Sequence, residues 1–298
     1  MNHSTDGVII QSVNPAIIME CSLPSAVLNY KTSRVEDMLS DDYFGLEGYE
    51  SNSSLKPALR SMAHYVHNKI TPRVDKPYFN LGSAIHAAIL EPIRFQNEYV
   101  VSPVYDGRTK AGKQAKSEFL AENFGKFIIT DDDMEVINGI AENVAYHSDA
   151  MHLLKAGKSE VSYFWPDPET DIWMRARVDS ESLYATLDIK STDDASTKGF
   201  VKSCAKFSYD MQAYIYSEAR SQVLGESKQF VFLAVEKKAP YTIGLYAASS
   251  EMLASGLLQY REALRRVAEY RANPSTHTGY QSDGRIQELD WPTWAYFR

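Results

Sequence analysis

The sequence has 298 residues, of which 44% are hydrophobic and 23% are charged, and its formal net charge is −8. Such values are typical of a folded protein with one large domain or two modest ones. No run of about 18 apolar residues predicts a membrane span, and the acidic balance argues against a protein that coats nucleic acid non-specifically.

The N-terminus and the cysteines indicate the compartment and exclude some metal sites. The opening MNHSTDGVII lacks the basic region and long apolar core of a secretion signal, so we predict a cytoplasmic protein. Cys21 and Cys204 are too few and too far apart for a structural zinc site or a four-cysteine iron–sulfur cluster. We expect both to be buried thiols.

The chain is predicted to have an irregular N-terminal arm, residues 1–50, followed by one domain over residues 51–298. Pro15, Pro24 and a run rich in Ser and Asp interrupt any regular pattern in the arm. One helix is expected from Ser53 or Ser54 through Ile70, because its apolar residues recur at helical spacing.

The next expected helix covers residues 81–90, with Asn80 as its N-cap. His86 lies within it among small apolar residues. This histidine is either a hydrogen-bonded core residue or a metal ligand or phosphate contact.

A basic cluster follows in the stretch SPVYDGRTKAGKQAKSEF, which we predict to be a flexible segment containing glycine. Arg108, Lys110, Lys113 and Lys116 make it the densest positive region of an acidic chain. It is either a solvated loop or a contact to the DNA backbone. Thr130 and Asp133 resemble a capping box that begins a helix extending to about Tyr146.

From residue 158 the pattern becomes that of β-strands. A hairpin is predicted with strands Glu160–Trp165 and a second one ending in Asp179, joined by the turn PDPETD. A polar turn, Ser180–Ser182, leads to a third strand that contains Asp188 and Lys190. Alternation places these two on one face and Leu187 and Ile189 on the other.

If these strands pair, two carboxylates and a lysine converge on one side of a sheet. Arg175 and Arg177 alternate along the same strand that ends in Asp179. A divalent ion such as Mg²⁺ is commonly held by one or two carboxylates plus a substrate phosphate. It activates water and neutralises phosphoryl charge, while a lysine orients the water or stabilises the transition state. The alternative is a surface hairpin with solvated charges.

The C-terminal third is predicted to contain three helices and two strands. The helices cover residues 196–204, residues 208–224 with Ser208 as N-cap and Gly225 as the stop, and residues 250–271. The strands QFVFLAVEK and YTIGLYA flank Pro240. Gln212 and Tyr216 are four residues apart, so they share one face of their helix.

In chain order, the motifs SNSSLKPALRSMAHY, LGSAIHAAILEP, GRTKAGKQAK, EVSYFW with MRARVDS, LDIKST and YDMQAYIY resemble the nuclease domain of exodeoxyribonuclease VIII. That domain belongs to the PD-(D/E)XK superfamily, with the RecB-type nuclease domain and phage lambda exonuclease. The resemblance covers roughly residues 53–216. It implies an α/β fold with a central mixed β-sheet flanked by helices, the restriction-endonuclease-like core.

The resemblance also implies roles for individual residues. Asp179, Asp188 and Lys190 match the catalytic acids and lysine of the family, although many members have glutamate at the second acid. The metal would be Mg²⁺, with Mn²⁺ as a substitute. The implied metal ligands are His86, Asp179, Asp188 and the carbonyl of Ile189. The residues expected to contact DNA or support the site are Glu160, Arg175, Arg177, Gln212, Tyr216, Arg108, Lys110 and Lys113.

The activity implied is that of a 5′→3′ exonuclease acting on double-stranded DNA ends in recombination, encoded by a phage or prophage. A single-strand annealing protein and a homo-oligomeric ring are implied partners. Two alternatives remain: an endonuclease or flap nuclease on the same core, and an inactive module that binds DNA ends.

Overall fold

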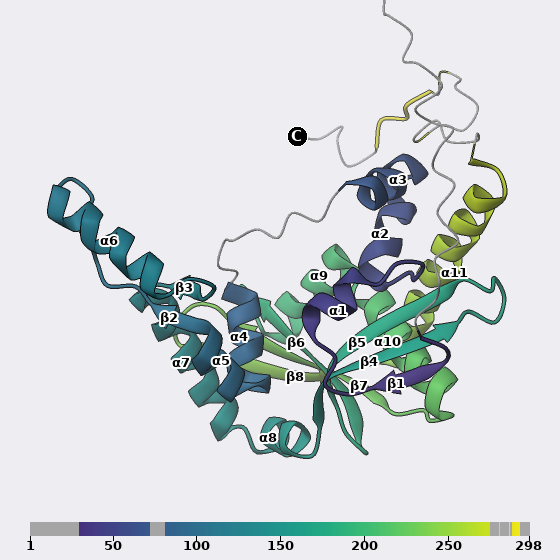
Figure 1. Ribbon diagram of the computed structural model, residues 1–298. Helices are drawn as coiled ribbons and strands as arrows, with labels where there is room; N and C mark the ends of the chain where they lie inside the picture. The colour runs from purple at the N-terminus through teal and green to yellow at the C-terminus, as the bar shows by residue number, and fades with distance from the viewer. Residues whose placement is uncertain (1–29, 72–80, 275–279, 281–285, 287, 293–298) are drawn as a thin grey trace, which may run out of the picture.

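A computed structural model describes residues 30–71, 81–274, 280, 286 and 288–292. Their centre is a six-stranded mixed sheet with helices on both faces (Figure 1). The strand order is β1-β4-β5-β6-β7-β8, in which β6 and β7 are parallel and all other neighbours are antiparallel. The predicted α/β fold with a central mixed sheet is therefore confirmed.

The main sheet and a small parallel pair account for the strands of the described residues. The main sheet consists of β1 (Ser33–Val35), β4 (Lys158–Pro166), β5 (Trp173–Glu181), β6 (Ala185–Thr192), β7 (Gln229–Glu236) and β8 (Ile243–Ala247). The pair consists of β2 (Tyr99–Val101) and β3 (Phe127–Ile129).

Two groups of helices cover the sheet. On one face lie α2 (Asn52–Arg60), α3 (Met62–Ile70), α9 (Thr197–Phe207), α10 (Tyr209–Leu224) and α11 (Ser250–Ala272). On the other lie α4 (Leu81–Leu90), α5 (Pro92–Glu98), α7 (Asp131–Tyr146) and α8 (Ser148–Lys155). None of the helices in the described residues combines the length and the apolar character needed to cross a membrane.

The alternation predicted for the central strands is confirmed. Met174, Ala176 and Val178 of β5 lie in the core beneath α10 and α11. Leu187 and Ile189 of β6 lie in the core beneath α4 and α7. Asp188 and Lys190, which alternate with these two residues on β6, therefore point towards α10. The predicted capping box at Thr130 is also present at the start of α7.

The single helix predicted for residues 53–70 is wrong, because two helices, α2 and α3, occupy this stretch. The chain between them is extended at Ser61, with φ −168° and ψ 159°, and the Ser61 hydroxyl caps α3 by accepting the N–H of His64. A serine at this position ends one helix and starts the next, although the apolar spacing continues through both.

The basic stretch predicted to be a flexible segment is largely helical. The N-cap of α6 (Lys110–Glu122) is Thr109, whose hydroxyl accepts the N–H of Gly112. A side chain at Gly112 would meet the carbonyl of Asp106 at 2.1 Å, so the close turn before the helix requires glycine. Figure 1 shows α6 projecting away from the sheet beyond β2 and β3.

The predicted N-terminal arm is described only from residue 30. There β1 pairs with β4, and α1 (Ser40–Gly45) follows it. The boundary at residue 50 stays a prediction. Two expectations lie outside the described residues: the Asn80 cap and a buried Cys21. Cys204 is buried as expected, and burial raises the pKa of its thiol to about 11.

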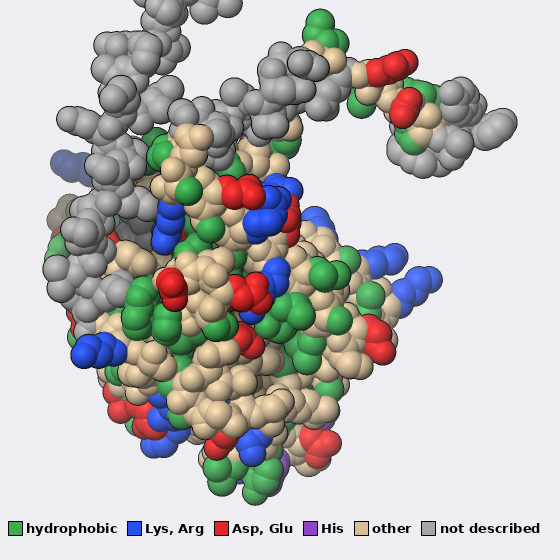
Figure 2. Space-filling view, turned by 90° about the vertical axis from the view of Figure 1, so that its right-hand side faces the viewer, with side chains coloured by type: hydrophobic (Ala, Val, Ile, Leu, Met, Phe, Trp, Pro, Cys, Tyr) green, Lys and Arg blue, Asp and Glu red, His purple; other side chains and the backbone are tan. Residues whose placement is uncertain are grey.

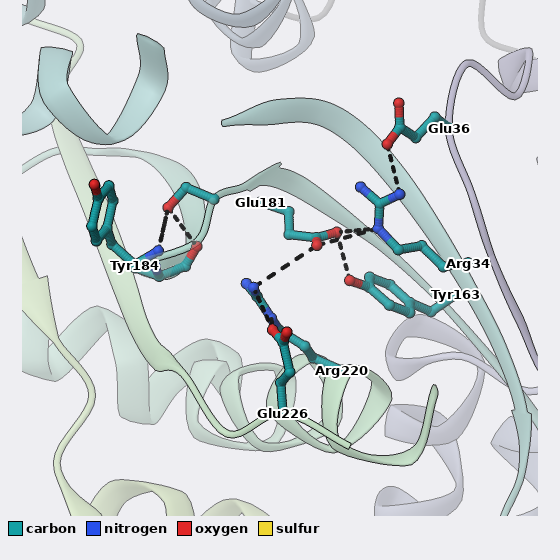
Figure 3. A network of polar contacts seen from close by, with 9 residues as sticks. Arg34, Glu36, Tyr163, Glu181, Tyr184, Arg220 and Glu226 are labelled. Carbon is teal, nitrogen blue, oxygen red and sulfur yellow. Dashed lines mark hydrogen bonds and ion pairs between the residues drawn. The ribbon is translucent and has the colours of Figure 1, made fainter. Parts of the chain in front are cut away.

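A buried ionic network connects β1, β4, β5 and α10 at the end of β5 (Figure 3). Glu181 accepts hydrogen bonds from Nε of Arg34 at 2.9 and 3.2 Å and from the Tyr163 hydroxyl at 2.5 Å. Nη2 of Arg220 lies 3.9 Å from the same carboxylate and 2.9 Å from Glu226. This network attaches the short strand β1 to the sheet.

Candidate active site

The sheet opens between β5 and β6 next to two aspartates. The two strands pair only at Ser180 with Leu187 and at Glu181 with Thr186. Beyond these pairs the strands separate, and the N–H of Ile189 donates to Oδ2 of Asp179 at 2.7 Å instead of to a backbone carbonyl. The carboxylate of Asp179 therefore lies beside the backbone that carries Asp188.

Asp188 is fully buried and has few donors. Its Oδ1 accepts a hydrogen bond from Nε2 of Gln212 at 2.8 Å. Its Oδ2 has the ammonium of Lys190 as its one donor among the described residues. Burial raises the pKa of Asp188 to about 6; the ammonium of Lys190 opposes this rise and the carboxylate of Asp179 adds to it.

Lys190 remains charged in this setting. Burial lowers its pKa, but the carboxylates of Asp188 and Asp179 outweigh this effect and raise the pKa above its usual value. The ammonium also lies 5.0 Å from the centre of the Tyr209 ring, a cation–π distance. Lys190 is therefore held between one carboxylate and one aromatic ring.

His86 approaches the same site from α4, on the other face of the sheet. Its Nδ1 lies 3.3 Å from Oδ2 of Asp179, and its side chain is 29% exposed. The small residues Ala84 and Ala87 of α4 are buried, which brings this helix close to the sheet. Of the two alternatives for His86, the structure favours a place at the site over a place within the core.

Glu160 on β4 lies opposite Asp179. The register pairs Ser159 with Ser180 and Val161 with Val178, so these two acids fall between the two pairs. The backbone of Glu160 is left-handed, with φ 54°, which is strained for a residue other than glycine. Burial raises the pKa of Glu160 to about 7, and the carboxylate of Asp179 contributes to the rise.

Two adjoining cavities lie beside these acids and share Glu160. The first has a volume of about 1130 Å³ and the second about 800 Å³. The first is lined by, among others, Glu160, Asp179, Arg175, Arg177, Gln212 and Tyr216. The second is lined by, among others, Glu160, His86, Arg94, Ser191, Tyr99 and Phe127. The predicted pair Gln212 and Tyr216 therefore does face the site from α10.

Arg175 and Arg177 line the first cavity but also hold the N-terminal segment. Arg175 donates to the carbonyls of Tyr43 and Leu46. Arg177 donates to the carbonyls at positions 38 and 39 at 3.1 and 3.3 Å, and its guanidinium lies 4.2 Å from the Tyr43 ring centre. Their predicted contact with DNA stays a prediction, but the structure gives them a clear structural task.

The structure does not bring the other predicted basic residues to the acids. Arg108, Lys110 and Lys113 are exposed at or near the start of α6, away from the sheet. On the face shown in Figure 2, Lys and Arg are interspersed with Asp and Glu and form no extended patch of one sign. Contact of α6 with DNA would therefore lie outside the immediate site.

A family model described as "PDDEXK-like domain of unknown function (DUF3799)" matches residues 51–278. The chain belongs to this family. The predicted membership of the PD-(D/E)XK superfamily is thereby confirmed, and the restriction-endonuclease-like description of the core with it.

One solved structure shares the fold at low sequence identity. A crystal structure described as "Putative exonuclease" from Eubacterium rectale is 14% identical, with a TM-score of 0.56, and the match covers 88% of this chain and 99% of that one. Another, described as "Crystal structure of SSO0001", is 11% identical, with a TM-score of 0.30 and coverages of 72% and 84%. No curated protein matches the chain.

The donors at this PDDEXK-like site fit a hard divalent cation. Among the described residues, no three His, Cys, Asp or Glu side chains are arranged to hold an ion by themselves. Mg²⁺ does not require this, because it keeps several waters and takes one or two carboxylates plus phosphate oxygens. The buried Oδ2 of Asp188 has one donor, the ammonium of Lys190, among the described residues, so it has a lone pair left for such a ligand.

Sequence reasoning missed Lys56 and Tyr209 at this site. Lys56 of α2 lies 5.8 Å from the centre of the Tyr209 ring, the same ring that Lys190 faces. The available signal was a charged residue following Leu55 in the motif SNSSLKPALR, but lysine is common on helix surfaces. Its significance depends on how α2 packs against α9 and α10, which the local pattern does not encode.

Proposed function

We propose that the protein is a metal-dependent exonuclease that hydrolyses phosphodiester bonds at the ends of linear double-stranded DNA, with Mg²⁺ as the ion and 5′→3′ polarity. The observation that carries the proposal is the convergence of Asp179, Asp188 and Lys190 where β5 and β6 separate. Membership in the PDDEXK-like family supports a nuclease. The description of the Eubacterium rectale protein agrees with an exonuclease.

Each side chain has a task that its contacts support. Asp179 and Asp188, with the carbonyl of Ile189 and the imidazole of His86, would hold the ion. A divalent cation bound there lowers the pKa of water and neutralises charge that develops on the phosphoryl oxygens. Lys190 would orient the attacking water or stabilise the transition state, because its charged ammonium is already aimed at Asp188.

The supporting residues keep the acids in position. Gln212 fixes Asp188 through its 2.8 Å hydrogen bond, and the N–H of Ile189 fixes Asp179. Burial raises the pKa of the Tyr216 phenol well above its usual value, and the charges of Asp188 and Asp179 raise it further, so this side chain remains neutral. Gln212 is a neutral donor, so it holds the carboxylate of Asp188 in place without cancelling its charge.

The same proposal includes partners and location. A homo-oligomeric ring would let an acidic chain surround DNA with basic residues such as those of α6, and a single-strand annealing protein would receive the product. Both belong to a cytoplasmic role in recombination or phage DNA processing. These parts rest on the resemblance rather than on a contact in the structure.

The test is a time course on linear duplex DNA labelled at one 5′ or one 3′ end. We expect nucleotide release only with Mg²⁺ or Mn²⁺, with loss of the 5′ label first. Cleavage of a covalently closed circle would favour the endonuclease alternative. Binding to DNA ends that persists in EDTA, with no release when Mg²⁺ is restored, would favour the inactive module.

A further inference from the structure

A second lysine lies next to Lys190 but belongs to none of the groups described for the metal. Lys56 extends from α2 towards the end of α9, where its ammonium donates to the carbonyl of Phe207 at 2.6 Å. An ammonium has three N–H donors. Within the described ranges, the Phe207 carbonyl is the one acceptor of the Lys56 ammonium, and no carboxylate forms an ion pair with it. Lys56 is only partly buried, so the remaining donors are open to solvent or to a ligand.

The charge on Lys56 is electrically linked to the candidate active site. Burial lowers the pKa of Lys56 to about 8, the nearby ammonium of Lys190 lowers it further, and the carboxylates of Asp188 and Asp210 oppose this. Two ammonium groups near one aromatic ring repel each other at a cost that the carboxylate of Asp188, already paired with Lys190, offsets in part. An anion between or beside them would remove that cost.

We propose that Lys56 binds a phosphate of the substrate strand next to the phosphate that is cleaved. Lys190 is paired with Asp188, so it faces the phosphate at the metal. Lys56 lies beside the same Tyr209 ring but comes from α2, so it would meet the neighbouring one. The proposal rests on the proposed nuclease function and adds a substrate-binding residue to it.

Lys206 provides a matched control on α9. Its ammonium lies 5.1 Å from the Phe207 ring centre, so it also makes a cation–π contact. Unlike Lys56, Lys206 is exposed and lies near the surface end of its helix. A change at Lys206 therefore removes a lysine and a ring contact without removing a charge beside Lys190.

The experiment compares the variants Lys56→Met and Lys206→Gln on linear duplexes that carry one neutral methylphosphonate linkage. The linkage is placed in turn at each phosphate beside the one that is cleaved. We expect Lys56→Met to lower kcat/KM about tenfold to a hundredfold, as for loss of a charged hydrogen bond. At one linkage position the neutral linkage should lower the kcat/KM of the wild-type enzyme by the same factor. At that position it should not lower the kcat/KM of Lys56→Met any further. Lys206→Gln should behave as wild type throughout.

Two results would overturn the proposal. One is equal activity of Lys56→Met and Lys206→Gln. The other is that the effects of Lys56→Met and of the neutral linkage on kcat/KM multiply at every linkage position. That result would mean that Lys56 only joins α2 to α9. Met keeps the apolar stem, and Lys56→Arg, which keeps the charge, should retain most activity if Met fails to fold.

A binding measurement separates this proposal from the proposed function. If the wild-type protein releases no nucleotides from any DNA, the nuclease function fails. Lys56 is then judged by binding of the same duplexes in EDTA to Asp188→Asn, with and without Lys56→Met. Weaker binding that is insensitive to the neutral linkage at one position still supports the phosphate contact, and unchanged binding overturns it.

Discussion

β5 brings acidic side chains into two buried clusters that differ in how their charge is compensated. Glu181 is 8% exposed and is surrounded by two guanidinium groups and a hydroxyl (Figure 3). Asp179, two residues earlier, lies beside Asp188, which is fully buried and receives one amide and one ammonium. In the first cluster two guanidinium groups lie beside Glu181, although Nη1 of Arg220 has no hydrogen-bond partner among the described residues, whereas in the second two carboxylates share one lysine.

The difference teaches which buried charges indicate function. A buried carboxylate with a full set of donors stabilises a fold, or at least does not weaken it. A buried carboxylate whose pKa is raised and which has fewer donors than lone pairs points to a ligand that the fold does not supply. Both clusters include a residue of β5, so matched substitutions in each cluster can test whether one serves stability and the other serves activity.

The largest expected effect is that of Asp188→Asn on activity. We expect nucleotide release from linear duplex DNA in Mg²⁺ to fall about a thousandfold or more, because the amide cannot replace the charged oxygen at the cation. The free energy of unfolding, measured in urea, should change by less than about 1 kcal/mol, because the loss of the Lys190 pair is offset by relief of repulsion with Asp179. Retained cleavage by a clean preparation would contradict the assignment.

Glu181→Gln should have the opposite profile. It leaves Arg34 and Arg220 without their shared counter-charge, and breaking a buried pair costs about 3 to 5 kcal/mol. We expect that loss in urea unfolding, with activity per folded molecule near that of wild type at low temperature. Glu226→Gln is the control, because Glu226 is 40% exposed and its loss leaves Arg220 beside Glu181, so it should cost clearly less than Glu181→Gln. Equal costs for both variants would remove the contrast.

Much of the central sheet follows from local pattern. Alternation placed Met174 of β5 in the core, and it placed Leu187 on one face of β6 with Asp188 and Lys190 on the other, since period two is a property of any strand. Thr130 and Asp133 marked the start of α7 because a capping box is local chemistry. These features need no knowledge of distant contacts.

The remaining features depend on contacts that the local pattern does not contain. Ser61 interrupts a helical stretch whose apolar spacing is continuous, and only its cap on α3 reveals the break. The separation of β5 from β6 depends on how the sheet twists, and the left-handed backbone of Glu160 accompanies it. Tertiary packing also decides that Lys56 faces Tyr209.

A smaller effect is expected from Gln212→Ala. Its amide orients Asp188, and loss of a group that holds a metal ligand usually weakens metal affinity about tenfold to a hundredfold. The Mg²⁺ concentration for half-maximal activity should rise by that factor, with little change at saturating Mg²⁺. Gln222→Ala is the matched control, because Gln222 lies on the same helix, is exposed and binds Glu218. An unchanged Mg²⁺ requirement would show that Gln212 has no such role.

The smallest effect concerns the basic helix α6, which lies outside both clusters. Lys110 and Lys113 are exposed, and α6 has no buried residue, so their removal should not affect stability. If they bind phosphates, the double variant Lys110→Gln/Lys113→Gln should bind duplex DNA a few fold more weakly. The slope of log affinity against log salt concentration should then fall by about one for each phosphate that a lysine no longer neutralises.

The control for α6 is Lys155→Gln/Lys158→Gln, which removes two exposed lysines at α8 and the start of β4. Both variants change the net charge equally, so a general effect of charge would lower the salt slope in both. Binding of α6 to the DNA backbone lowers it only in the first. Equal slopes would assign these lysines to solvent and leave recognition of DNA to the residues around Asp179 and Asp188.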